Sequence, residues 1–156
     1  MVALVRNIRT DAPQAIHRTA IAADGSKGEV EGKSRLAFGP TAGGAIKLDP
    51  DDAVTLALAV GEGIESTLSL RLLPEVGATP AWALLDAGHL EACPVLAGIE
   101  SLFVAVDHDA SGRGERAAEA VADRWQDAGS EVRLIMPLRE GYDLNDIVQG
   151  GRRYAG

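Results

Sequence analysis

Four short apolar runs constrain the fold of this 156-residue chain more than any other feature. Runs of this kind are typical of strands that are covered on both faces of a sheet. Segments with helical spacing follow, and the clearest has Ala117, Val121 and Trp125 at every fourth position, with Gly129 placed to end the helix. Strands that alternate with helices predict a parallel sheet built from βαβ units. The four runs are residues 53–60, 81–86, 101–107 and 131–137.

The first 50 residues have a different pattern. Residues 1–8 and 14–22 have strand-like apolar content, Asp24-Gly25 is a hairpin signal, and a third short strand is expected at 45–48. This pattern predicts a small antiparallel sheet. We therefore divide the chain into a β-rich N-terminal segment, 1–50, and an α/β domain, 51–156.

The composition excludes several classes of protein. With 46% hydrophobic and 24% charged residues, the chain reads as a soluble globular protein. Its one cysteine, Cys93, permits neither an intrachain disulfide nor a cysteine-rich zinc site. No leader pattern and no apolar run of bilayer length is present, so we expect no membrane association and a cytoplasmic location.

The charge is unevenly distributed along the chain. Residues 1–48 contain seven Lys/Arg and four Asp/Glu, a balance of +3, whereas residues 49–156 contain eight and nineteen, a balance of −11. The sum, −8, argues against a protein that binds nucleic acid through its overall charge. Solvated helix faces account for many of the acids, but not for those that follow the apolar runs.

Acidic residues follow all four apolar runs. Ligands of parallel α/β sheets bind beyond the carboxyl ends of the strands, so we expect these acids to meet at one edge. Two carboxylates as near in sequence as Asp107 and Asp109 repel each other, and a divalent cation, Mg²⁺ in the first place, would compensate. The acids are Glu62 and Glu65, Asp86, Asp107 and Asp109, and Asp143 and Asp146.

Each of these residues also has a purely structural interpretation. Glu62 or Glu65 could favour the positive end of the following helix, and Asp143 could be a helix N-cap. A helix is expected to begin at Ser111 or Gly112, with amides that could receive a phosphate. Arg113 lies in its first turn, where it could contact a phosphate or form an ordinary salt bridge. His108 is expected to point away from the two aspartates that flank it.

Three ordered segments together resemble the Toprim domain shared by bacterial-type primases, topoisomerases and some nucleases. The segments are GEGIES (61–66), VAVDHDASG (104–112) and GYDLNDI (141–147), and the resemblance covers roughly residues 54–149. Their form is most similar to primases and primase-helicases of phages and mobile elements. The resemblance implies a Toprim-like, Rossmann-like parallel four-stranded sheet flanked by helices and preceded by a small β-rich segment.

The resemblance also implies a role for each acid. Glu62 would be the general acid or base, Asp107 and Asp109 would coordinate Mg²⁺, for which Mn²⁺ substitutes, and Asp143 and Asp146 would complete or support the metal site. Arg113 is carried over as a phosphate contact. Since carboxylates repel nucleic acid, basic residues of the first third must hold the strand, with surface solubility as the alternative; the candidates are Arg6, Arg9, Arg18, Lys33, Arg35 and Lys47.

The leading hypothesis is a primase domain that joins ribonucleotides on single-stranded DNA. Primases of this kind carry a zinc-binding module and often a helicase, so such a domain is expected in the full-length protein or in trans. A Toprim nuclease and a non-catalytic nucleic-acid-processing interaction module remain open. An aspartyl phosphatase of the haloacid dehalogenase type is disfavoured, because that family places its aspartate motif after the first strand of the sheet.

Overall fold

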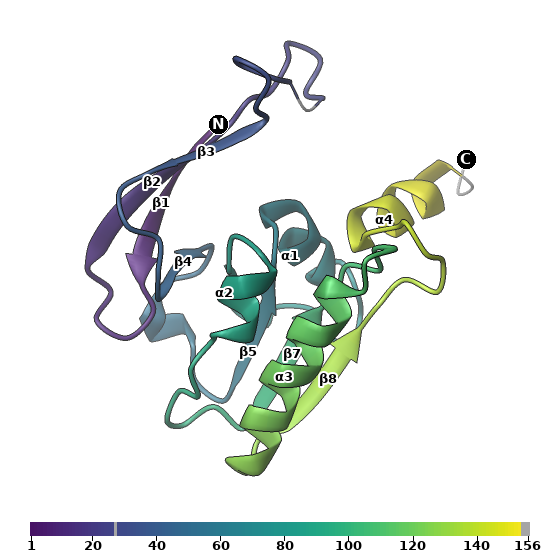
Figure 1. The fold of residues 1–156 in the computed structure, drawn as a ribbon. Helices are drawn as coiled ribbons and strands as arrows, with labels where there is room; N and C mark the ends of the chain where they lie inside the picture. Colours follow the sequence, from purple (N-terminus) through teal and green to yellow (C-terminus); the bar gives the residue numbers. More distant parts are fainter. Residues whose placement is uncertain (27, 154–156) are drawn as a thin grey trace. The chain divides into compact units, whose positions relative to one another are not determined.

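The computed structural model describes residues 1–26 and 28–153 (Figure 1). The chain divides into two compact units, an N-terminal unit formed by residues 1–46 and a C-terminal unit that begins at Lys47. Over the described residues, no helix has the length and apolar character needed to cross a membrane.

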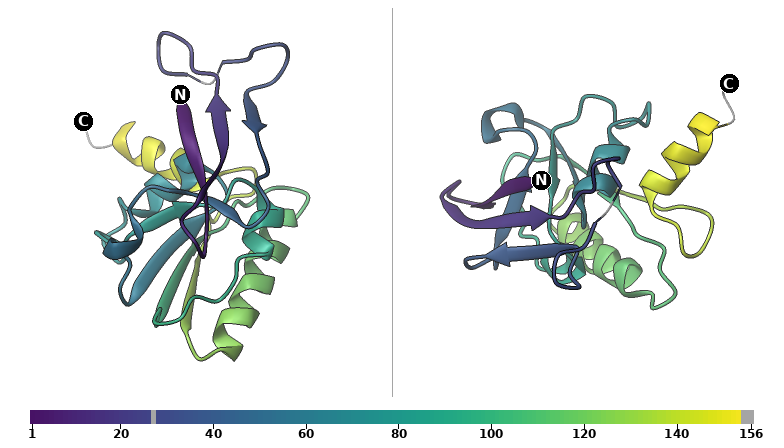
Figure 2. Two further views of the ribbon diagram at one scale, coloured as in Figure 1. Left: turned by 90° about the vertical axis from the view of Figure 1, so that its left-hand side faces the viewer. Right: turned by 90° about the horizontal axis from the view of Figure 1, so that it is seen from above.

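The N-terminal unit is an antiparallel sheet. Its strands are β1 (Val2–Asn7), β2 (Pro13–Thr19), β3 (Arg35–Phe38) and β4 (Gly44–Lys47), in the order β3-β2-β1-β4. The three expected strands are confirmed as β1, β2 and β4, although β2 ends at Thr19 and not at residue 22, whereas β3 was not predicted. Asp24-Gly25 lies in the long connection between β2 and β3 that Figure 2 shows extending beyond the strands.

The C-terminal unit contains the predicted parallel sheet. Its strands are β5 (Ala57–Gly61), β6 (Ala81–Ala83), β7 (Ser101–Ala105) and β8 (Glu131–Ile135), in the order β6-β5-β7-β8 with every pair parallel. The first strand, β5, begins four residues later than expected, and the expected start at residue 53 lies in a short 3-10 helix, Asp51–Ala53.

Four helices flank this sheet. They are α1 (Ile64–Leu70), α2 (Ala87–Glu91), α3 (Arg113–Asp127) and α4 (Leu144–Arg153). The predicted stripe of Ala117, Val121 and Trp125 on α3 is buried, and Gly129 follows the helix with a φ of 93°. The amide of Ser130 donates to the Trp125 carbonyl, so the helix ends as the sequence predicted.

The helices cover both faces of the parallel sheet. On one face, Ala59 and Phe103 pack with Leu70 of α1 and Leu144 of α4. Side chains alternate along a strand, so Leu58 and Leu102, both fully buried, point to the opposite face. Helices α2 and α3 pack together in front of the sheet in Figure 1, and the left view of Figure 2 shows α3 and α4 on opposite sides of the strands.

Candidate active site

Glu62 stands at the turn between strand β5 and helix α1. The turn is tight, because a Cβ on Gly61 would lie 2.7 Å from the Oγ1 of Thr67 and 3.0 Å from the Cβ of Ala105. Thr67 fixes the turn further by donating its hydroxyl to the Gly63 carbonyl over 2.7 Å. The glycines of the first motif therefore hold Glu62 at the carboxyl end of a central strand.

The carboxyl group of Glu62 is in an unfavourable place for a negative charge. Its Oε1 is buried and accepts no hydrogen bond from the described residues. Burial raises the pKa of Glu62 to about 7, and the carboxylates of Asp107, Asp109 and Asp86 add to this rise, while the guanidinium of Arg113 opposes it. Near neutral pH the group can therefore both accept and release a proton.

Asp107 and Asp109 follow strand β7 and have different environments. The Ser66 hydroxyl of α1 donates to the Oδ1 of Asp107 over 3.0 Å. The carboxylate of Asp109 accepts from the amides of Ser111, at 2.7 Å, and Gly114, at 3.4 Å. The hydrogen bonds from Ser111 are the main cause of a lowered pKa for Asp109. Asp109 thus accepts hydrogen bonds from amides that were expected to be available to a phosphate. Helix α3 begins at Arg113, one or two residues beyond the expected start at Ser111 or Gly112.

Gly114 brings the first two motifs together. A Cβ at this position would lie 2.6 Å from the carbonyl oxygen of Asp107 and 3.0 Å from the Oε1 of Glu62. Only a residue without a side chain lets the first turn of α3 approach both groups. Neither Gly114 nor Ser66 was among the predicted site residues, although Gly114 is the one glycine inside α3.

The loop that carries the third motif runs beside the Asp107–Asp109 loop. The amide of Gly141 donates to the His108 carbonyl over 2.7 Å, and the His108 amide donates to the Tyr142 carbonyl over 3.4 Å. The His108 ring contacts the Pro137 carbonyl at 2.9 Å and the Glu115 carboxylate at 3.4 Å. His108 therefore joins the two loops and is engaged away from the aspartates, as expected.

Asp143 and Asp146 form a capping box at the start of α4. The Asp143 amide donates to the Oδ2 of Asp146 over 3.1 Å, and the Asp146 amide donates to the Oδ1 of Asp143 over 2.9 Å. This is the structural interpretation that the sequence left open, and here it involves both residues.

The described residues around Glu62 do not form a ready-made metal site, but their charges are compatible with a cation. Within residues 1–26 and 28–153, no three or more His, Cys, Asp or Glu side chains are grouped so as to hold a metal ion. The unbonded Oε1 of Glu62 and the like charges of Asp107 and Asp109 are costly, and a bound cation would remove that cost. Magnesium binding by the predicted acids stays a prediction.

Two basic residues of the C-terminal unit, Arg113 and Lys47, differ in how accessible their side chains are to a phosphate. Arg113 is exposed, and its Nη2 would lie 3.7 Å from a Cβ added to Gly88. Because its guanidinium is exposed, Arg113 remains a candidate phosphate contact. Lys47 was predicted to hold the strand, and this is wrong: its side chain is 3% exposed and binds Asp51. Its ammonium lies 4.5 Å from the centre of the Trp82 ring, which explains why it is buried.

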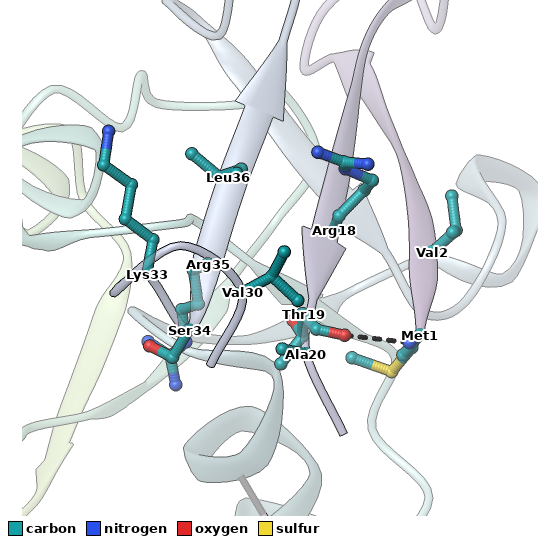
Figure 3. A pocket seen from close by; sticks show the side chains of 10 residues that line it. All are labelled: Met1, Val2, Arg18, Thr19, Ala20, Val30, Lys33, Ser34, Arg35 and Leu36. Atoms are coloured by element: carbon teal, nitrogen blue, oxygen red, sulfur yellow. Dashed lines mark hydrogen bonds between the residues drawn. The ribbon is translucent and has the colours of Figure 1, made fainter. Parts of the chain in front are cut away.

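Arg18, Lys33 and Arg35 of the N-terminal unit all line one pocket (Figure 3). Arg18 pairs with Leu36 across the strands, and Arg35 pairs with Thr19. Side chains alternate along a strand, so Arg18 and Arg35 point to opposite faces, as Figure 3 shows. The basic residues that were predicted to contact a nucleic-acid strand thus lie on two different faces of this β-sheet.

Comparison with known proteins agrees with this architecture. A family model for the Toprim domain matches residues 57–152. The primase fragment of the bacteriophage T7 primase-helicase protein has a TM-score of 0.63 and 16% identity over 96% of this chain and 58% of that chain. A DNA primase domain from Pseudomonas aeruginosa has a TM-score of 0.52 and 19% identity over 95% of this chain and 52% of that chain. No curated protein sequence matches.

Proposed function

The chain belongs to the Toprim domain family, and on that premise we propose that it catalyses metal-dependent nucleotidyl transfer, as the catalytic domain of a DNA primase. Family membership supports a function in nucleic-acid processing. The finer proposal is RNA primer synthesis from ribonucleotides on single-stranded DNA. The chain spans little more than half the length of the two primase structures that share its fold, so a zinc-binding or helicase partner in cis or in trans is part of this proposal.

The environment of Glu62 carries the proposal. A glutamate at the end of a central strand, with an unbonded carboxyl oxygen and a pKa of about 7, is suited to general acid–base chemistry at neutral pH. A structural glutamate at a helix start would instead be solvated or hydrogen-bonded. Glu62 would accept the proton of the attacking hydroxyl group, and that transfer would also relieve its own repulsion by Asp107 and Asp109.

The other residues would position the reactants. Asp107 and Asp109 would hold Mg²⁺ or Mn²⁺, with Asp143 and Asp146 in a supporting role. When bound, the ion would neutralise phosphate charge and orient the reacting oxygens. Arg113 would contact a phosphate of the incoming nucleotide, since its guanidinium already lies within electrostatic reach of Glu62. Ser66 would fix the orientation of the Asp107 carboxylate through its hydrogen bond.

The test is a synthesis assay on the purified chain. Labelled ribonucleotides, unlabelled single-stranded DNA and Mn²⁺ are incubated with the wild type, Asp107→Asn and Glu62→Gln, and products are resolved on a denaturing gel. Asp123→Asn is the matched control, because Asp123 is an exposed acid further along α3. We expect labelled oligoribonucleotides from the wild type and the control, and none from the two site variants.

Two other outcomes would reject the proposal in favour of the alternatives. Metal-dependent shortening of end-labelled DNA, without synthesis, would indicate a Toprim nuclease that uses the same acids. If neither reaction occurs even after a zinc-binding and a helicase domain from a related primase are added, the chain is a non-catalytic interaction module.

A further inference from the structure

One face of the β1–β2–β3 sheet exposes large side chains that a soluble sheet would normally bury. The strand register places three residues in one row across the strands and three in the next. The opposite face carries Val5 and Ala15, which are buried. Exposed apolar surface of this extent generally marks a binding site. The rows are Val2, Arg18 and Leu36, and Leu4, Ile16 and Phe38.

A pocket at the edge of this face combines apolar walls with positive charge. Val2, Val30 and Leu36 line it together with Arg18 and Lys33, and none of the described residues that line it is acidic (Figure 3). Figure 3 shows the side chains of Arg18, Leu36 and Lys33 on the same side of the strands. The pocket therefore suits a ligand that has both an apolar, flat part and a negative charge.

Arg18 and Phe38 supply flat surfaces beside this pocket. The guanidinium of Arg18 lies over the Phe38 ring, 4.5 Å from its centre. Phe38 is 56% exposed in spite of this contact. Aromatic rings and guanidinium planes are the groups on which proteins stack unpaired bases.

We propose that this face binds single-stranded nucleic acid, with an unstacked base against Arg18 and Phe38 and a neighbouring phosphate at Lys33. Charge favours this ligand over a protein segment, because residues 1–46 contain six Lys/Arg and four Asp/Glu, whereas the remainder contains nine and nineteen. Duplexes are disfavoured, since their bases are stacked and cannot reach a flat protein surface.

This inference deepens the proposed function by assigning a place to the strand, and it rests on that function for the nature of the ligand. Binding at this face uses none of the acids near Glu62. The experiment contains EDTA and no ribonucleotides, so it can succeed where synthesis fails, and it can fail where synthesis succeeds.

The experiment is a titration of a fluorescently labelled oligothymidylate with the whole chain, followed by anisotropy at several salt concentrations. Loss of a stacked base weakens binding about 5- to 150-fold, and we expect an effect in this range for Phe38→Ala. Arg18→Lys keeps the charge but not the plane, so it should weaken binding while leaving the salt dependence unchanged. Lys33→Ala should lower the slope of log K against log salt by about 0.7.

Arg133→Ala is the matched control, because Arg133 is an exposed cation on strand β8 of the C-terminal unit and is not among the candidate strand contacts. We expect it to change the affinity less than Arg18→Lys does. The substituted side chains are exposed, and an unchanged circular dichroism spectrum will verify folding. An equal loss for Arg133→Ala and Phe38→Ala would reject a defined base site in favour of diffuse charge.

Two competitors complete the test. A duplex of the same sequence and free thymidine monophosphate should each displace the labelled strand at least about 10-fold less well than the unlabelled strand. Equal competition by the duplex would overturn base stacking, and equal competition by the mononucleotide would indicate a nucleotide pocket instead of a strand site. Absence of any binding to the oligothymidylate would also overturn the proposal.

Discussion

Replacing Glu62 by glutamine should stabilise the C-terminal unit at high pH. Burial raises the pKa of Glu62 from 4.5 to about 7, so the folded chain keeps a proton that the unfolded chain loses. Stability from this group is therefore complete below about pH 4.5 and is lost as the pH rises through 7. Glu62→Gln cannot ionise and avoids the loss.

The size of the effect follows from the shift. A change of about 2.5 pH units corresponds to at most about 3.4 kcal/mol, and partial solvent exposure of the carboxyl group reduces this to about 1.5 kcal/mol. The variant should exceed the wild type by this amount at pH 8, and the two should be equal near pH 4.5. For a unit of this size the difference at pH 8 corresponds to about 6 °C in Tm.

Urea denaturation in EDTA, followed by tryptophan fluorescence between pH 4.5 and 8.5, measures this difference. Both tryptophans, Trp82 and Trp125, are buried in the C-terminal unit, so the signal reports its unfolding. Glu119→Gln, an exposed position on α3, is the control and should match the wild type at each pH. A constant difference between Glu62→Gln and the wild type across the pH range would refute the reasoning.

Two further substitutions test the architecture of the site. Gly114→Ala should destabilise the fold by about 1–3 kcal/mol in urea, since its Cβ would lie 2.6 Å from the Asp107 carbonyl oxygen. Gly150→Ala on α4 is the control and should not destabilise the fold, because the added Cβ meets nothing within 4 Å. Similar free energies of unfolding for the two variants would contradict this prediction. Asp143→Ala should cost about 0.5–2 kcal/mol through the loss of the Asp146 capping box, whereas Asp143→Asn should keep most of that stability. If Asp143→Asn is stable but no longer responds to Mn²⁺ in synthesis, the residue has the predicted metal role; unchanged synthesis would limit it to capping.

Sequence patterns predicted the parallel sheet because buried strands are continuous apolar runs. They also predicted α3, whose stripe of Ala117, Val121 and Trp125 has the period of a helix. Strand β3 was missed because it has only four residues, and its three apolar residues, 36–38, are followed directly by the turn residues Gly39 and Pro40. The alternation of side chains along a strand could have placed Arg18 and Arg35 on opposite faces of the sheet, but only if β3 had been predicted.

Long-range contacts were beyond the reach of the patterns. Ser66 and Asp107 are 41 residues apart, and nothing in either segment indicates their hydrogen bond. Burial of Lys47 depends on Asp51 and on the ring of Trp82, so its charge alone was misleading. The positions of the acids after the strands were predictable because the sheet is parallel. Their individual partners were not, since these depend on how each loop turns.

The distribution of charge implies that the proposed strand binding and the proposed catalysis would have separate requirements. The C-terminal unit has nineteen Asp/Glu against nine Lys/Arg, so a phosphate that approaches Glu62 meets repulsion until a cation compensates. The N-terminal unit, with a balance of +2, needs no such help to attract a strand. It follows that a chelator should abolish synthesis at a concentration that leaves the affinity for single strands unchanged. Moderate salt should have the opposite effect and weaken the affinity for single strands before it removes the cation. The reason is that salt screens the contacts to the nucleic-acid strand before it displaces a cation held by several carboxylates.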